Sequence, residues 1–181
     1  MTDLVLTLIG PDRPGLVEAV AEVVAAHGGN WLESRMAHLA GKFAGILRIE
    51  VSGDKAPALL AALADLDSRG IKVVGEPSGE ASTAAAGRTL DLELVGLDRP
   101  GIVREISQLL ANSGANVEEL STDRTSAPMS GEMLFLAKAR VRLPTSADLG
   151  TLRAALERLA SDLMIEIRMV ETSLEAKPRK T

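Results

Sequence analysis

Two copies of a short turn carry the residues of this chain that are best suited to bind a small charged molecule. The first copy reads Gly-Pro-Asp-Arg-Pro-Gly over residues 10–15, and the second reads Gly-Leu-Asp-Arg-Pro-Gly over residues 96–101. Each turn follows an apolar, strand-like run and precedes a helical one, so free backbone N–H groups of the first helical turn should surround a small space. The positive end of the helix dipole there favours a carboxylate by roughly 0.3 to 1 kcal/mol in exposed geometry.

Side chains near each turn can bind a positively charged group, in addition to the carboxylate that the helix N-terminus favours. Asp12 and Asp98 can take an ammonium group or satisfy N–H groups of their own turn, and Asn30 and Asn116 offer both a donor and an acceptor. A zwitterion needs partners of both signs, and these residues provide them. A purely structural role stays open, because Asp, Pro and Gly are common turn residues and arginines on turns are often solvated.

The two turns belong to an internal duplication. Residues 4–33 align without a gap with residues 90–119 at a constant offset of 86, and 13 of these 30 positions are identical. A repeat of this length is too long for a solenoid unit, so each copy should be a small domain with its own core. The 181 residues therefore predict two domains of roughly 80 residues each.

The first strand of each copy has an alternating pattern. Leu90, Leu92 and Leu94 face one way and Asp91 and Glu93 face the other, which is typical of a sheet that is wet on one side. In the first copy the positions that face away from the core carry Val5, Thr7 and Ile9 instead, which suggests that something covers this face.

A helix should follow each turn and pack on the sheet. Its apolar residues are spaced i, i+4, i+7 and i+8 in both copies, which defines one stripe. Pro14 and Pro100 suit the first helical turn, and Gly28 and Gly114 suit the left-handed residue that ends a helix. The stripes consist of Leu16, Val20, Val23 and Val24, and of Ile102, Ile106, Leu109 and Leu110.

The remaining elements complete a βαββαβ order in each copy. This order predicts an α+β fold of two ferredoxin-like units, each with an antiparallel sheet and its helices on one face. The predicted domains are 1–76 and 89–172, joined by a flexible linker at 77–88 and followed by a loose tail at 173–181. The further strands are expected at 30–39, 42–51, 71–75, 116–123, 133–143 and 164–170, and the second helices at 57–68 and 147–161.

Composition excludes several classes of function. The net charge of −5 and the pI near 5.1 argue against direct binding of nucleic acid, and no cysteine is present to form a disulfide or a thiolate site. His27 and His38 are the only histidines, so we expect no metal and no cofactor; His27 should instead contact the last carbonyls of its helix. No signal peptide, membrane-spanning run or hydrolase elbow is visible, so a cytoplasmic protein without enzyme activity is expected.

These residues carry a resemblance to a known family. A βαββαβ unit with G-x-D-R-P-G after its first strand and G-[GA]-N after its first helix resembles an ACT domain. Two such units without an attached enzyme are similar to the glycine cleavage system transcriptional repressor family. The stretch from Asn30 to Phe43 is more specific to that family than the turn itself, which also occurs in ACT domains fused to amino-acid and folate enzymes.

The resemblance implies a ligand site made of the turn and first helix of one module and the start of the second strand of the other. The two copies differ around it, because Pro11, His27, Trp31 and Leu32 correspond to Leu97, Ser113, Val117 and Glu118, so two equal sites are not expected. Carried over by position, the ligand-binding residues are Asp12, Arg13, Pro14, Gly15, Asn30, Asp98, Arg99, Pro100, Gly101 and Asn116.

The sequence thus predicts a regulatory protein that senses a small amino acid, with glycine the first to test, and acts on transcription through a partner. The expected partners are a small amino-acid effector, a DNA-binding transcriptional regulator and, in a homodimer, a second copy of the chain. Neither nucleic acid nor a membrane is an expected direct partner. Two alternatives stay open: an amino-acid-binding accessory or oligomerisation module of an amino-acid or folate enzyme, and a structural module whose turns bind nothing.

Overall fold

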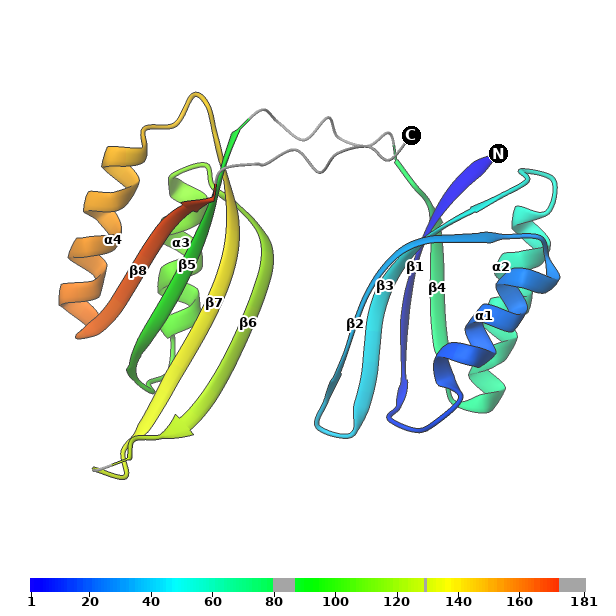
Figure 1. Ribbon diagram of the computed structural model, residues 1–181, viewed down its shortest axis with the longest axis horizontal. Coiled ribbons are helices and arrows are strands. Elements are labelled where there is room, and N and C mark those ends of the chain that lie inside the picture. The colour runs from blue at the N-terminus through cyan, green and yellow to red at the C-terminus, as the bar shows by residue number, and fades with distance from the viewer. Residues whose placement is uncertain (80–86, 129, 173–181) are drawn as a thin grey trace. The chain divides into compact units, whose positions relative to one another are not determined.

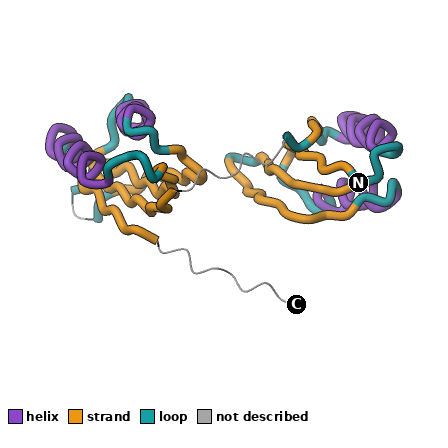
Figure 2. The backbone as a smooth tube through the Cα atoms, turned by 90° about the horizontal axis from the view of Figure 1, so that it is seen from above, coloured by secondary structure: helices purple, strands orange, loops and turns teal. Residues whose placement is uncertain are grey.

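The chain folds into two compact units, which we call domain 1 (Met1–Ser82) and domain 2 (Thr83–Thr181). The computed structural model describes residues 1–79, 87–128 and 130–172. Each domain is a four-stranded antiparallel sheet with two helices on one face (Figures 1 and 2). The predicted α+β, ferredoxin-like architecture is confirmed in both copies.

Domain 1 has the spatial strand order β2-β3-β1-β4. The central strands β1 and β3 pair over their full length, from Thr2 opposite Val51 to Pro11 opposite Lys42. Its elements are β1 (Thr2–Pro11), α1 (Leu16–Ala26), β2 (Asn30–Leu39), β3 (Lys42–Val51), α2 (Ala56–Ala64), the 3-10 helix η1 (Asp65–Arg69) and β4 (Lys72–Pro77).

Domain 2 repeats this topology with the order β6-β7-β5-β8. Both outer strands on the hairpin side contain an irregularity at the same place, between Trp31 and Glu33 in β2 and between Val117 and Glu119 in β6. The elements of domain 2 are β5 (Gly87–Leu97), α3 (Ile102–Asn112), β6 (Asn116–Ser126), β7 (Met133–Pro144), α4 (Leu149–Leu163) and β8 (Ile165–Thr172).

Each core lies between the sheet and its two helices. Alternate residues of the first strand point into it, and Leu6 and Leu90 are completely buried. The predicted helical stripe packs against them, with Val20 of α1 and Ile106 of α3 both buried. The duplicated sequence pattern therefore produces two separate cores with the same construction.

The ends of α1 and α3 follow the sequence, except at the prolines. Gly28 and Gly114 are left-handed, with φ of 71° and 72°, as expected of residues that end a helix. The His27 ring contacts the carbonyl of Val23 through Nδ1 at 2.9 Å, as predicted. Pro14 and Pro100 were expected in the first helical turn, but both precede the helix, because a left-handed glycine stands between proline and helix.

Several predicted boundaries differ from the structure; β4, β7, α4 and β8 are shifted by one or two residues. The second helix of domain 1 ends at Ala64, where the chain tightens into η1, and β6 continues beyond the predicted Asp123 to Ser126. The predicted linker 77–88 is shortened at both ends, because β4 reaches Pro77 and β5 begins at Gly87, and residues 80–86 between them lie outside the described residues. The predicted tail 173–181 also lies outside them.

Candidate functional site

The turn of domain 1 leads directly from β1 into the N-terminus of α1. The backbone N–H of Asp12 donates to the carbonyl of Gly41 at 3.0 Å, and Arg13 Nη2 donates to the carbonyl of Arg69 at 2.7 Å. Residues 11–15 are all exposed. The turn is thus held from two sides by hydrogen bonds to backbone carbonyls while its surface stays open to a ligand.

A left-handed glycine forms the N-cap of the helix in both domains. Gly15 has φ 85° and ψ 2°, and Gly101 has φ 92° and ψ −6°. Neither helix receives a side-chain cap, in contrast to α4, where the Asp148 carboxylate accepts a hydrogen bond from the N–H of Thr151 at 2.7 Å. Helix α2 also lacks a side-chain cap, but a proline in its first turn removes one of the N–H groups. The N-termini of α1 and α3 therefore present backbone donors that no side chain of the cap satisfies.

The turn of domain 2 has the same backbone but a different set of charge contacts. The N–H of Asp98 donates to the carbonyl of Met133 at 2.8 Å, and its carboxylate lies 2.7 Å from Nε of Arg124 in β6. Arg99 Nη2 donates to the carboxylate of Glu105 in α3 at 2.9 Å. Both charged side chains of this turn are therefore already paired within the domain.

Domain 1 has neither of these partners at the equivalent positions. His38 occupies the place of Arg124, as the strand pairing shows. His38 lies opposite Phe43, which pairs with Gly10 of β1. Arg124 lies opposite Phe135, which pairs with Gly96 of β5. The buried Ala19 occupies the place of Glu105. An ammonium group that approaches Asp12 therefore meets no guanidinium at the matched position.

The structure separates the asparagines from the turns within each domain. Asn30 lies opposite Glu50, which lies opposite Asp3 at the start of β1, whereas Asp12 follows the end of that strand. The nine residue-to-residue steps from Asp3 to Asp12 correspond to roughly 30 Å at about 3.3 Å per residue. Asn116, opposite Arg142, has the equivalent place in domain 2. The four turn residues of each domain lie together, and its asparagine lies at the other end of the sheet.

Sequence reasoning did not identify Arg124 and Glu105 as neighbours of the second turn. Glu105 is four residues after Gly101, so its place in the first turn of the helix was accessible from spacing alone. Arg124 reaches Asp98 only because β6 extends past Asp123 and because the register of β6 on β7 sets Arg124 opposite Phe135. No local pattern encodes that register across the loop.

Other kinds of site find no support in the described part of the chain. No group of three His, Asp or Glu side chains there has the arrangement of a metal site. None of the helices that the structure describes is long and apolar enough to cross a membrane.

Comparisons with known proteins agree with this architecture. Residues 2–73 and residues 85–161 each match a family model described as an ACT domain. ACT domains are regulatory modules that bind small amino-acid effectors and often form oligomers. No curated protein matches the chain.

Solved structures of the same size share the fold over almost the whole chain. A protein of unknown function from Galdieria sulphuraria is 28% identical and aligns with a TM-score of 0.80 over 95% of this chain and 99% of its own. A proposed glycine cleavage system transcriptional repressor is 19% identical, with a TM-score of 0.71 over 95% of this chain and 98% of its own. Together with the two family matches, this shows that the chain belongs to the ACT domain family and consists of two ACT domains in tandem.

Proposed function

We propose that this chain is a cytoplasmic, non-enzymatic regulator that binds a small amino acid at its Asp-Arg-Pro-Gly turns and transmits the signal to a partner that controls transcription. The single observation that carries the proposal is the pair of helix N-termini without a side-chain cap, each preceded by an aspartate and a left-handed glycine. ACT domains bind small amino acids, and the turn has the N–H groups and the carboxylate that such a ligand would contact.

The chemistry of the turn matches a free amino acid. The ligand carboxylate would accept hydrogen bonds from the first N–H groups of the helix, where the helix dipole adds a favourable field. The ligand ammonium would bind the carboxylate of Asp12 or Asp98 through a charge-assisted hydrogen bond. Both kinds of group belong to one exposed turn in domain 1.

Domain 1 is the stronger candidate for the working site. In domain 2 an ammonium group has to displace Arg124 from Asp98, a contact of 2.7 Å, before it can bind. In domain 1 the position that matches Arg124 carries His38, and Arg13 donates to the backbone carbonyl of Arg69 and has no acidic partner among the described residues. We therefore expect occupancy at Asp12 to exceed occupancy at Asp98.

Glycine is the effector to test first, because it is the ligand that the family resemblance suggests and because a side chain is not required for either contact. The partner is expected to be a DNA-binding regulator, since a chain with net charge −5 lacks the basic surface that phosphate binding needs. The ligand can act on such a partner only if it binds one arrangement of the protein better than another.

An accessory role in an amino-acid or folate enzyme is the second candidate. ACT domains with the same turn are found fused to such enzymes, and this chain would then serve as a separate regulatory subunit. Co-purification of the full-length chain with a metabolic enzyme, and not with a DNA-binding protein, would favour this alternative.

Titration of the full-length protein with amino acids tests the proposal. Glycine and the other common amino acids are screened by melting temperature and then by calorimetry, and a ligand at 100 times its Kd should add about 2.7 kcal/mol of stability. Asp12→Asn should abolish this stabilisation and Asp98→Asn should reduce it less. Asp67→Asn in η1 removes the same charge from an exposed site of domain 1 and should leave it unchanged.

Two outcomes count against the proposal. If no common amino acid releases heat or raises the melting temperature, the turns bind no such ligand. If a ligand binds equally well to the wild type, to Asp12→Asn and to Asp98→Asn, it binds somewhere else on the protein.

A further inference from the structure

The sheet of domain 1 has an apolar outer face, on the side that its helices do not cover. Val5 and Ile9 of β1, Ile46 of β3 and Val74 of β4 are exposed by 38%, 45%, 49% and 62%. They are adjacent, because Thr7 lies between Val5 and Ile9 on β1 and is opposite Ile46 on one side and Val74 on the other. Four large apolar side chains therefore surround the centre of this face.

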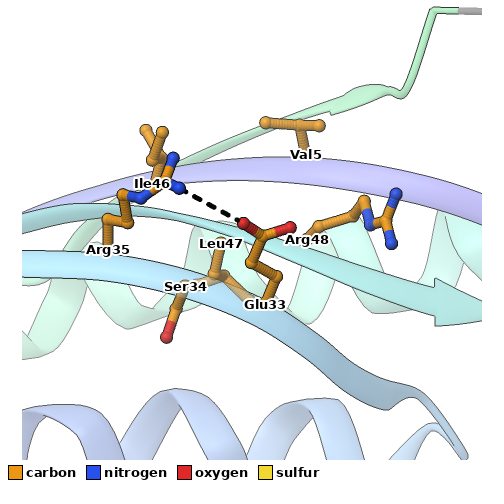
Figure 3. A pocket seen from close by; sticks show the side chains of 7 residues that line it. All are labelled: Val5, Glu33, Ser34, Arg35, Ile46, Leu47 and Arg48. Carbon is orange, nitrogen blue, oxygen red and sulfur yellow. Dashed lines mark ion pairs between the residues drawn. The ribbon is translucent and has the colours of Figure 1, made fainter. Parts of the chain in front are cut away.

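Charged side chains of both signs surround this apolar centre. Figure 3 shows Val5 and Ile46 on the same side of the sheet as Glu33, Arg35 and Arg48, with a Glu33–Arg35 ion pair of 3.6 Å between the residues drawn. Farther along the same face, Arg48 approaches Asp3 at 3.9 Å. On the other side of β1, the register sets Glu76 beside Val5 and Lys72 beside Ile9.

The same face of domain 2 is built differently on the same backbone. Asp91, Glu93 and Lys138 occupy the positions of Val5, Thr7 and Ile46, as the pairing of β5 with β7 shows. Lys138 lies 3.3 Å from Glu93, and Arg140 lies 3.0 Å from Asp91. This fold therefore accepts charged side chains at the centre of the outer face, where domain 1 has Val5, Thr7 and Ile46.

We propose that the outer face of the domain 1 sheet packs against the same face of a second copy of this chain, in a dimer with two-fold symmetry. A two-fold interface brings a surface against itself, so it requires self-complementarity. An apolar centre meets this requirement, and a surrounding ring with both signs of charge allows the basic groups of one copy to face the acidic groups of the other.

The size of the face fits a dimer that dissociates on dilution. Three strands of 10 residues and β4 with six, at about 3.3 Å per residue and about 4.8 Å between strands, give about 570 Å² for each copy. The two copies together would bury about 1,100 Å², which is just above the roughly 1,000 Å² expected of a specific interface and below the standard size. Aligned packing of two such sheets would leave about 10 Å between them.

The outer face of domain 2 is a poorer occupant than a second copy of domain 1. Covering it with apolar side chains would remove water from the ion pairs of Asp91 and Glu93 with their arginine and lysine. The desolvation free energy of such charges exceeds their mutual attraction unless every charged group finds a new partner. The face that best matches the apolar centre is therefore an identical one.

Sedimentation velocity of the full-length protein without ligand, across a range of concentrations, tests the dimer. Ile46→Lys introduces the residue that domain 2 carries at this place, and should raise the dimer Kd by about 100-fold. Thr7→Glu combined with Ile46→Lys transfers the whole ion pair of domain 2, so the sheet should fold while dimerisation is lost. Val95→Lys, on the outer face of domain 2, is the matched control and should leave the Kd unchanged.

A second measurement uses the absence of cysteine from the chain. The single-cysteine variant Thr7→Cys should form a covalent dimer with a bismaleimide that spans about 10 Å. The matched variant Glu93→Cys, on the outer face of domain 2, should not.

Three results would overturn the proposal. A wild-type protein that stays monomeric at all concentrations would show that this face does not bind a second copy of the chain. A dimer that persists in Ile46→Lys would have its interface elsewhere. A monomeric Thr7→Cys variant whose thiol is shielded from a monofunctional maleimide would show that other residues of the same chain cover the face.

Discussion

Replacement of Gly15, the left-handed N-cap of α1, should lower the free energy of unfolding by an amount that follows from its φ. An L-residue forced to the φ of 85° seen at Gly15 loses roughly 1 to 2 kcal/mol. A Cβ added there would meet no described atom closer than Glu18 Oε2 at 3.7 Å, so Gly15→Ala introduces backbone strain without a clash. Alanine also restricts the unfolded chain, which returns roughly 0.4 to 1 kcal/mol. We therefore expect a net loss of about 1 kcal/mol in the free energy of unfolding.

Urea unfolding followed by tryptophan fluorescence measures this loss. Trp31 is the only tryptophan, and it is half-buried against the core of domain 1, so its signal reports that domain. With a slope of about 1 kcal/mol per molar urea for a domain of this size, the midpoint should fall by about 1 M. Gly15→Asn should cost less than Gly15→Ala, because asparagine tolerates the left-handed region better.

Gly79→Ala is the control for this experiment. No described atom lies within 4 Å of a Cβ at Gly79, and its φ is not positive, so the substitution should leave stability unchanged or raise it slightly. A Gly15→Ala variant that unfolds at the wild-type midpoint, or an asparagine variant that loses as much stability as the alanine variant, would contradict this prediction. Either result would mean that the φ of the N-cap does not limit which residue can stand there.

Two further predictions concern domain 2. Thr89 is 6% exposed and its Oγ1 has no hydrogen-bond partner among the described residues. Thr89→Val should therefore raise the melting temperature measured by circular dichroism. A lower melting temperature would indicate that Oγ1 has a hydrogen-bond partner after all. A hydrogen bond from the Thr172 hydroxyl and the Arg140 guanidinium lower the pKa of Asp91 in the folded protein. The Asp91 carboxylate therefore stabilises the fold above pH 3.8, and this stabilisation is lost as the pH falls through the lower folded-state pKa. Asp91→Asn should accordingly melt below the wild type at pH 7 and at the same temperature in strong acid, and a gap that persists in acid would refute this origin.

Elements with a strong local pattern could be predicted from the sequence. The hairpin strands 30–39 and 42–51 have the predicted bounds, because alternation and the Ala40–Gly41 turn are local features. The end of α2 was missed because the tightening into η1 depends on how Leu66 packs into the core. The end of β6 was missed because its last residues pair only once β7 is in place.

The candidate site shows the same limit. The turn residues lie together because they are contiguous, and the duplication identified them. The pairing of Asp98 with Arg124 depends on strand register, and the separation of Asn30 from Asp12 depends on the length of β1. Two contacts of domain 2 thus distinguish the turns: the Asp98–Arg124 pair, which depends on the sheet, and the Arg99–Glu105 pair, which is local.

The different outer faces of the two sheets also bear on how the chain folds. Tandem domains of similar sequence are prone to misassembly in which one domain takes up a strand of the other. If β1 replaced β5 in the sheet of domain 2, Val5 would stand where Asp91 now lies, and Arg140 would lose the carboxylate 3.0 Å away. We expect this loss to disfavour the exchanged product, and refolding of Asp91→Asn should yield more of it. The ion pairs of domain 2 would then help each strand to pair within its own domain.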